Sequence, residues 1–458
     1  MSTPAQPKPV LNLLDSTCLI VGIIIGAGIY QMAPEIARGA GGPWGLMGLW
    51  LLGGLLSLCG ALCYAELAAA YPREGGDYVY LSRAYGSWAG FLFGWAQLTV
   101  IRPGDIAVMA FAFALYAREL FGAWTAGWGW SAETTLKVYA CAAVGALTWI
   151  NVLGVRAGKW TQNLLTLAKA LGLLAMAAAA VAAGPAGSPT EQAASVDPIP
   201  WTLALIFVLF TYGGWNEMAY VAAEVKDARR NIVRAMVLGM AAVTGLYLVV
   251  NAAFLYTLGF SGLAGSQAVA VDVVRAVWPE QAAALVSLLI CISALGAVNG
   301  LVLTGARISY ALGSDYRVFR WLGRWHPRWG TPAAALLVQG ALALGLILVL
   351  GDFVQTVLYT AAAVYTFYLG STLAVWVLRR KEPTVERPYR TWGYPWTPWL
   401  FAVVCGALIY SAVTYKPLLA GASVLLILTG LPVWWWSRRT AQRTSGTDPA
   451  EAESQTGS

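Results

Sequence analysis

Charged residues are scarce in this sequence. Asp, Glu, Lys and Arg make up 11% of the 458 residues, whereas an average soluble domain carries roughly a quarter. The hydrophobic share is 59%, and the mean hydropathy is +0.63. A water-soluble fold cannot cover so much apolar surface with so few charges. The composition therefore excludes an ordinary soluble protein and predicts an integral membrane protein.

Histidine and exposed cysteine are also nearly lacking. The single histidine, His326, lies in a loop with the sequence GRWHPRWG, and all six cysteines fall inside apolar runs. A Ser-His-Asp set, a Cys/His metal cluster or a phosphate-binding P-loop cannot be assembled from these residues. We therefore expect neither an enzyme nor a bound cofactor or metal.

Long apolar runs replace the missing charges. A run of 18 or more apolar residues can cross a bilayer core of roughly 30 Å. We expect an all-α membrane protein with about twelve transmembrane helices, at residues 14–35, 44–70, 86–117, 134–154, 162–183, 200–223, 234–259, 282–312, 332–350, 354–378, 398–415 and 418–436. The N-terminal residues lack the basic region of a cleavable signal.

The lysines and arginines that give the chain its net charge of +7 are distributed as the expected topology requires. If both termini are cytoplasmic, only five of the 29 lysines and arginines face outward, namely Arg38, Arg118, Lys137, Arg275 and Lys416. Lysine and arginine collect on the cytoplasmic side of membrane proteins. The basic balance is therefore a topology signal and does not indicate nucleic-acid binding.

Two of the expected spans contain glycines at their midpoints. The first carries Gly26, Ala27 and Gly28, and the sixth carries Gly213 and Gly214. Small residues in membrane helices often serve only to bring two helices close together. Because these glycines occupy matching places in two successive five-span blocks, they instead predict two broken helices of an inverted-repeat transporter.

The expected organisation follows from these blocks. We predict a cytoplasmic tail at 1–11, a first repeat at 12–183, an outer loop at 184–199, a second repeat at 200–378, an inner loop at 379–397, two further spans within 398–436 and a disordered cytoplasmic tail at 437–458.

Ionisable residues at membrane depth need a partner or a function, because a charge there is costly. Lys169 lies in the middle of the fifth span among apolar residues. Its ammonium can stand where other inverted-repeat transporters hold sodium and support the first broken helix. The alternative is a lysine whose stem reaches the interface.

Further ionisable residues allow more than one interpretation. Arg102 and Asp105 are three residues apart, so we expect them to form a structural ion pair, with a substrate contact as the alternative. Glu217 can cap free amides of the broken sixth helix or bind a proton. The charged segment 64–88, with Glu66, Glu74 and Asp77, is equally compatible with a re-entrant gate and a solvated connector.

Five motifs follow one another along the chain: GIIIGAGIY (22–30), YAELAAAYPREGGDYVYL (64–81), FTYGGWNE (210–217), LGAVNG (295–300) and RRKEPTVERPYR (379–390). In this order they resemble the amino acid, polyamine and organocation transporter superfamily over residues 12–436. IRP at 101–103, Lys169 after an alanine and FTYGGWN are similar to the L-type amino acid transporters, the light-chain family, and to their bacterial relatives.

The resemblance implies a substrate site. The substrate carboxylate would be held by backbone around Gly26, Ala27 and Gly28. The substrate ammonium would be held by carbonyls of Ile24, Phe210 and Gly213. Phe210 would close over the substrate, Gly214 belongs to the same break, and Asn216 and Tyr365 would face the pocket. Lys169 matches the family lysine that replaces a sodium ion.

Two departures from the family pattern matter. Ala27 stands where serine is often found, which leaves carboxylate recognition to backbone amides. The outer segment RELFGAWTAGWGWSAETT contains no cysteine. A disulfide to a heavy-chain partner is therefore not expected, which favours a bacterial member in the inner membrane, with a small amino acid and the lipid bilayer as its partners.

The sequence thus predicts a sodium-independent exchanger of neutral L-amino acids that works by alternating access. Two alternatives stay open. One is a proton-coupled amino acid or amine symporter, with Lys169 or Glu217 as the titrating group and Asp105 or Glu217 as acidic residues for a cationic substrate. The other is an amino acid sensor of the same fold that transports nothing.

Overall fold

The fold is nearly all helical. The computed structural model describes residues 9–26, 28–73, 75–185, 197–266, 268–350 and 353–445. Over these residues the only β-type pairings are two isolated bridges, Leu11 with Val225 and His326 with Thr331. Ten helices of the described chain are long and apolar enough to cross a membrane, and Trp201–Thr211 and Ala333–Val349 are shorter apolar helices. This confirms the predicted all-α membrane fold.

The first half of the chain contains five expected spans. Its helices are α1 (Leu13–Ile24), α2 (Gly28–Gln31), α3 (Ala33–Ala40), α4 (Pro43–Ala70), α5 (Asp77–Tyr85), α6 (Ser87–Ala96), the π-helical turn η1 (Gln97–Ile101), α7 (Arg102–Thr125), the 3-10 turn η2 (Ala126–Trp128), α8 (Ala132–Leu153) and α9 (Val155–Ala183). The third span is therefore α6, η1 and α7 in series.

The second half repeats this order and adds two spans. Its elements are α10 (Trp201–Thr211), α11 (Glu217–Tyr220), η3 (Ala222–Glu224), α12 (Ala228–Gly265), α13 (Val269–Arg275), α14 (Ala282–Asp315), η4 (Arg317–Phe319), α15 (Ala333–Leu350), α16 (Phe353–Lys381), α17 (Trp396–Tyr415), α18 (Pro417–Leu428) and α19 (Gly430–Ser445).

Corresponding helices of the two halves pack against each other. The second spans α4 and α12 are in contact, as are the third spans α7 and α14 and the fourth spans α8 and α15. Pairing of equivalent elements across a pseudo-two-fold axis is what an inverted repeat produces. The bundle therefore has one group formed around α4 and α12 and another around α7, α8, α14 and α15.

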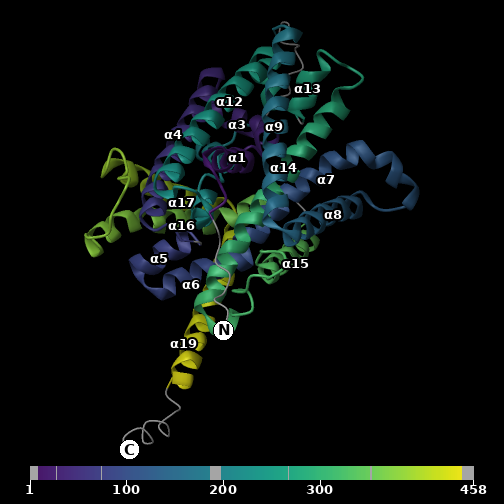
Figure 1. Cartoon of the computed structure of the whole chain (residues 1–458). Helices are drawn as coiled ribbons and strands as arrows, with labels where there is room; N and C mark the ends of the chain where they lie inside the picture. The colour runs from purple at the N-terminus through teal and green to yellow at the C-terminus, as the bar shows by residue number, and fades with distance from the viewer. Residues whose placement is uncertain are drawn as a thin grey trace, which may run out of the picture.

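The first broken helix occupies the middle of this bundle. Helix α1 packs against α9, α12 and α14, and Figure 1 shows it between the long helices α12 and α9. Its residues Leu19, Ile20 and Ile23 are buried. Beyond its polar first turn, a helix covered on several sides by other helices is held by packing of its apolar side chains.

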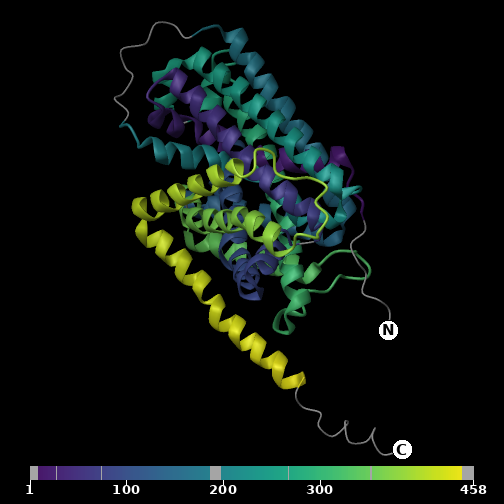
Figure 2. The same cartoon turned by 90° about the vertical axis from the view of Figure 1, so that its left-hand side faces the viewer.

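The last three helices lie on one side of the bundle. Figure 2 shows α17 and α18 along its flank, with α19 extending away from it. Large apolar side chains on α17 and α18 are exposed, among them Trp396, Tyr410, Leu418 and Leu425. Such a surface is unfavourable in water and fits contact with lipid tails.

One residue of the topology argument lies elsewhere than expected. Arg307 is not one of the five cations expected to face outward, so the topology places it on the cytoplasmic surface, but it is part of α14 and is 1% exposed. Its Nε donates to Glu224 Oε1 at 2.8 Å. A paired charge can be buried inside the bundle, so Arg307 contributes a buried ion pair and no surface charge.

Candidate functional site

The first helix break lies at the predicted glycines. Helix α1 ends at Ile24, and helical structure resumes at Gly28. Gly26 N donates to Ile24 O at 2.7 Å, which turns the chain out of the helix. Ala27, predicted to help hold the carboxylate, lies outside the described residues. The break leaves carbonyls of the last turn of α1 without partners inside the helix.

The second break lies at Gly213 and Gly214. Helix α10 ends at Thr211 and α11 begins at Glu217. Gly214 has φ of 113°, and a Cβ atom added to it would lie 2.7 Å from Ile23 Cγ2. Only glycine satisfies both this backbone conformation and this approach to α1. The sequence GG therefore allows the two broken helices to touch.

The two breaks are joined by a tyrosine that the sequence analysis did not identify. Tyr247 Oη lies 2.9 Å from Ile24 O and 3.3 Å from Thr211 O, so its hydroxyl can donate to the end of either half-helix. Tyr247 comes from α12 and is fully buried. Its neighbours in the sequence are apolar, so no local pattern marks it. Tyr247 holds the ends of α1 and α10 at one place.

A cavity lies beside the breaks. It encloses about 1030 Å³, counting the part open to solvent. All the described residues predicted for the substrate site line it: Ile24, Gly26, Gly28, Phe210, Gly213, Gly214, Asn216 and Tyr365. Gln97, Met109, Thr360 and Tyr368 also line it and were not predicted. The cavity is large enough for a small molecule.

The peptide groups around the cavity differ in how far they are satisfied. Ile24 O already lies within hydrogen-bond distance of Gly26 N and Tyr247 Oη. Phe210 O accepts from Gly213 N at 2.9 Å. Within the described residues, no donor reaches Gly213 O. Because a carbonyl oxygen has two lone pairs, Gly213 offers the freest acceptor of the three carbonyls predicted to bind an ammonium.

Lys169 lies behind the first break and not in the cavity wall. Its ammonium donates to Gly22 O and, at 2.7 Å, to Ile25 O. The side chain is 0% exposed. Gly296 of α14 makes room for it, since a Cβ atom there would lie 2.7 Å from Lys169 Cε. The lysine therefore places a cation at the carbonyl end of α1, where the helix dipole is negative.

The expected Arg102 and Asp105 ion pair is wrong. Arg102 Nη1 instead donates to Glu217 Oε1 at 3.0 Å, and both side chains are almost fully buried. Thr304 Oγ1 of α14 donates to Glu217 Oε2 at 2.5 Å. The π-helical turn η1 directly precedes Arg102, and an i+3 spacing allowed the pair with Asp105 but could not reveal a partner 115 residues away. Glu217 is thus a structural acceptor in the cavity wall.

The charged segment after α4 is packed into the protein and is not a solvated connector. Asp77 is fully buried and accepts hydrogen bonds from Tyr64, Ser371 and, at 2.8 Å, from Tyr220. Tyr220 in turn accepts from Asn216 Nδ2 at 2.8 Å. A chain of hydrogen bonds therefore runs from the second break to α5. Glu74 lies outside the described residues.

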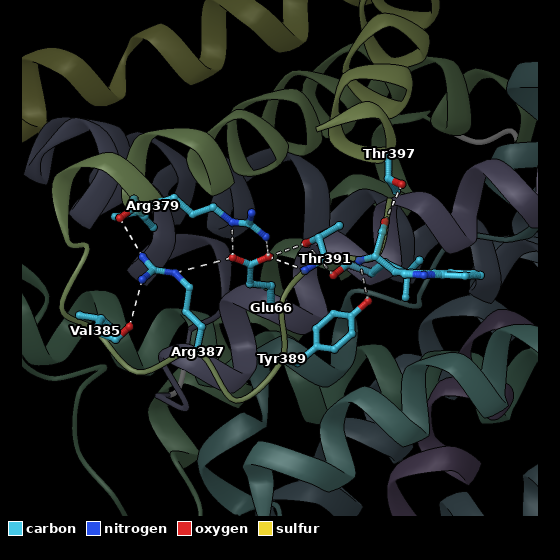
Figure 3. A network of polar contacts seen from close by, with 10 residues as sticks. Glu66, Arg379, Val385, Arg387, Tyr389, Thr391 and Thr397 are labelled. Atoms are coloured by element: carbon cyan, nitrogen blue, oxygen red, sulfur yellow. Dashed lines mark hydrogen bonds and ion pairs between the residues drawn. The ribbon is translucent and has the colours of Figure 1, made fainter. Parts of the chain in front are cut away.

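A second polar network ties the end of α4 to the segment after α16. Figure 3 shows the Glu66 carboxylate between Arg379 and Arg387 on one side and Thr391 on the other. Arg379 donates from Nε to Oε1 at 2.8 Å and from Nη2 to Oε2 at 2.7 Å. This is the bidentate geometry in which arginine binds carboxylates most strongly.

A tyrosine just beyond α4 reinforces the same region. Tyr71 Oη donates to Glu382 Oε2 at 3.0 Å, and Arg83 pairs with Glu382 at 2.8 Å. Burial, and then the bond to this carboxylate, raise the pKa of Tyr71 to about 12. The phenol is therefore a hydrogen-bond donor at physiological pH, and it fastens the end of α4 to the segment after α16.

Comparison with known proteins assigns the family. The family model for amino acid permeases matches residues 11–436. The chain is 29% identical to the serine/threonine exchanger SteT of Bacillus subtilis, over 94% of this chain and 97% of SteT. It is 31% identical to the mouse b(0,+)-type amino acid transporter 1, over 94% and 88% of the two chains, and 29% identical to the human Asc-type amino acid transporter 1, over 93% and 82%.

These relatives are transporters and not enzymes, and their names describe exchange or transport of amino acids. The match over residues 11–436 includes both helix breaks and Lys169. It agrees with the resemblance seen in the sequence motifs. The chain is a multi-pass membrane protein of the amino acid permease family, related to the L-type amino acid transporters, and it transports amino acids.

Proposed function

We propose that this protein is a sodium-independent exchanger of neutral L-amino acids that works by alternating access. The observation that carries the proposal is the meeting of the two helix breaks at one cavity, with the ammonium of Lys169 bound behind the first break. The names of SteT and of the b(0,+)-type and Asc-type transporters support amino acids as cargo.

The breaks suit the two charged ends of an amino acid. Amides at the start of the helical segment after Gly26 can donate to the substrate carboxylate, since the first N–H groups of a helix have no partner inside it. Gly213 O, and the more occupied Ile24 O and Phe210 O, can accept from the substrate ammonium. Phe210, at the edge of the same break, would cover the bound substrate, with Asn216 and Tyr365 beside it.

Lys169 supplies the reason to expect independence from sodium. Broken-helix transporters coordinate sodium with unwound carbonyls and half-helix ends. In this chain the carbonyls of Gly22 and Ile25 already receive two hydrogen bonds from a lysine. Ser293 Oγ donates to the same Ile25 O at 3.1 Å. A permanent ligand at these carbonyls takes the place that a coupling cation would need.

The proposal extends to the setting of the protein. The distribution of lysine and arginine favours cytoplasmic termini, and similarity to SteT along nearly its whole length favours a bacterial inner membrane. All six cysteines are free, and none lies in the outer segment between α7 and α8. We therefore propose that the protein functions without a disulfide-linked heavy chain.

Transport by reconstituted protein tests the proposal. Proteoliposomes are loaded with unlabelled amino acid or left empty, in sodium-free buffer, and uptake of a labelled neutral amino acid is measured. Exchange predicts fast uptake only into loaded vesicles. Uptake into empty vesicles driven by an imposed pH gradient would instead establish proton coupling. Saturable binding without any flux would establish a sensor.

A variant of Lys169 tests the role of the ammonium. Lys169→Met keeps an unbranched apolar side chain but removes the two hydrogen bonds to α1. We expect loss of most exchange activity, roughly 100-fold, because the end of α1 loses the cation that donates to two of its carbonyls. The control is Lys416→Met, since Lys416 is exposed in the turn between α17 and α18. Equal activity of the two variants would remove Lys169 from the mechanism.

A further inference from the structure

One part of the cavity wall is charged. Three ionisable residues line it: Arg102 and Asp105 of α7, and Glu217 at the start of α11. Their formal charges sum to −1. Peptide groups at the breaks account for the two ends of a zwitterion, so this charged wall faces the remaining part of a bound molecule.

Two of the three charged residues, Arg102 and Glu217, already pair with each other. Arg102 donates to Glu217 at 3.0 Å, and Thr304 donates to the second carboxylate oxygen of Glu217. The guanidinium also lies over the Tyr220 ring, 5.6 Å from its centroid. The pair is neutral as a unit and is held by three elements, so neither residue is free to follow a substrate.

Asp105 is different. Its side chain is half-buried and lines the cavity. Over the described residues, no hydrogen bond or ion pair reaches its carboxylate, and the charges of Arg102 and Glu217 act on it only at longer range. A carboxylate that is partly withdrawn from water and lacks a donor is unfavourable. A ligand that donates a hydrogen bond to this carboxylate would therefore remove an unfavourable feature that the described residues leave in place.

The direction of Asp105 follows from its helix. Arg102, Asp105 and Met109 are spaced i, i+3 and i+7 along α7, so they share one face, and all three line the cavity. Met109 Sδ lies 3.0 Å from where a Cβ atom on Gly26 would be. Asp105 is thus one helical turn, about 5–6 Å between Cβ atoms, from the side chain that touches the first break.

We propose that Asp105 selects the substrate by its side chain, and that preferred substrates carry a hydrogen-bond donor there. This inference rests on the proposed function, since it takes the helix breaks as the site of the amino and carboxyl groups. A substrate held at the breaks points its side chain along the Met109 face toward Asp105. A hydroxyl or an ammonium at the end of a short side chain then donates to the carboxylate.

The physical basis is the cost of leaving Asp105 unsatisfied. An apolar side chain would cover the carboxylate, exclude water from it and return no hydrogen bond. A donor-bearing side chain of the same size restores the lost contact. A site built to hydrogen-bond its substrate rejects an analogue that lacks the group far better than an apolar pocket distinguishes sizes.

Two matched pairs of amino acids test the proposal by binding. Threonine and valine have the same shape and differ by a hydroxyl. 2,4-Diaminobutyrate and norvaline have the same length and differ by an ammonium. The concentration of each that half-saturates the thermal stabilisation of the purified protein is measured. We expect the donor-bearing member of at least one pair to bind roughly tenfold or more tightly, and the pair that shows it identifies a neutral or a cationic donor.

Variants at Asp105 then assign the preference. In Asp105→Ala the half-saturating concentrations of the two members of the pair should differ by less than about twofold, chiefly because the donor-bearing member binds more weakly. Asp105→Asn keeps an acceptor oxygen but loses the charge, so it should retain part of a preference for threonine and lose a preference for diaminobutyrate. Glu386→Gln is the control, because this carboxylate is exposed and pairs with Arg229 away from the cavity. Its preference should equal that of the wild type.

The outcomes separate this inference from the proposed function. The proposal for Asp105 would be overturned if, in the wild type, the half-saturating concentrations of the two members differ by less than twofold in both pairs. It would also be overturned if Asp105→Ala leaves the preference unchanged. Loss of proton-driven uptake in Asp105→Asn without a change in preference would overturn it as well and assign proton coupling to this residue. Donor-selective binding with no exchange in vesicles would instead refute the exchanger and leave the role of Asp105 intact.

Discussion

The carboxylates of Glu66 and Asp105 lie in two regions of the bundle and differ in the number of donors that reach them. Glu66 receives two hydrogen bonds from Arg379, and the N–H and hydroxyl of Thr391 donate to it at 2.6 and 2.7 Å. Arg387 adds a charge at 3.7 Å. Asp105 receives none of these within the described chain. The first carboxylate is saturated and the second is open.

The difference separates two uses of a buried charge. Glu66 joins α4, the end of α16 and the segment before α17, three parts that are distant in the sequence (Figure 3). Such a charge fixes the positions of helices, since its many bonds offset the cost of removing it from water. Over the part of the chain that the structure describes, Asp105 joins no second element by a hydrogen bond or an ion pair. A charge that the fold does not use and that faces a cavity is available for a ligand.

Glu217 lies between these extremes. It has one charged partner, Arg102, and one hydroxyl donor, Thr304. It lines the same cavity as Asp105 but is already bound. The three carboxylates therefore form a series with decreasing numbers of donors. Replacing each by its amide removes a charge and changes little else, so the series predicts decreasing effects on stability.

The largest effect is expected for Glu66→Gln. The amide cannot accept from both arginines and Thr391 at once, so buried or partly buried guanidinium groups lose their counter-charge. Breaking a buried ion pair on one side costs about 3–5 kcal/mol. We expect a clear drop in the unfolding temperature of the detergent-solubilised protein, with lower expression. The exposed pair Arg229 and Glu386 is the control, and Glu386→Gln should change the unfolding free energy by less than about 1 kcal/mol. Similar shifts for both variants would show that the Glu66 network does not hold the helices together.

An intermediate effect is expected for Glu217→Gln. Arg102 loses its carboxylate, but Asp105 lies three residues away and can take over as its counter-charge. The loss should be about 1.5–3 kcal/mol, the range for a hydrogen bond to a charged group. A double-mutant cycle that combines Glu217→Gln with Asp105→Asn measures how far Asp105 compensates for the loss of Glu217. The double variant should lose more stability than the two single variants together, because Arg102 then has no carboxylate nearby. Additive losses would exclude any coupling between Asp105 and Arg102.

Much of the site could be predicted from the sequence because the signals are local. Gly213 and Gly214 in an apolar run mark a break directly, since glycine permits the backbone that other residues avoid. Lys169 is conspicuous because a lysine deep in a span needs acceptors. Phe210 and Asn216, which line the cavity beside the breaks, were predicted from the family resemblance. Tyr365 came from family resemblance alone.

The pairing of charges could not be predicted in the same way. Arg102 has Asp105 three residues away, and the i+3 rule favours that pair. Because α7 and α11 both pack against α14, the partner that Arg102 reaches is Glu217. Tyr247 and Glu66 carry no local signal, because their partners come from other spans. Which of two nearby carboxylates remains free depends on how helices far apart in the sequence pack. The sequence named Asp105 and Glu217 as acidic candidates for a cationic substrate, and the structure shows that Glu217 is already bound by Arg102 and Thr304.

The smallest effect on stability is expected for Asp105→Asn, and here the sign of the change in unfolding free energy matters more than its size. This substitution is the same chemical change as Glu66→Gln, but it removes a charge that has no donor. The free energy of unfolding should change by no more than a surface substitution changes it, about 0.5 kcal/mol, or it should increase. An increase is possible because a partly buried carboxylate without a donor destabilises the fold. The measurement is thermal unfolding of both variants side by side without amino acid. A drop comparable to that of Glu66→Gln would mean that Asp105 supports the fold, and the contrast between a fastening carboxylate and an open one would fail.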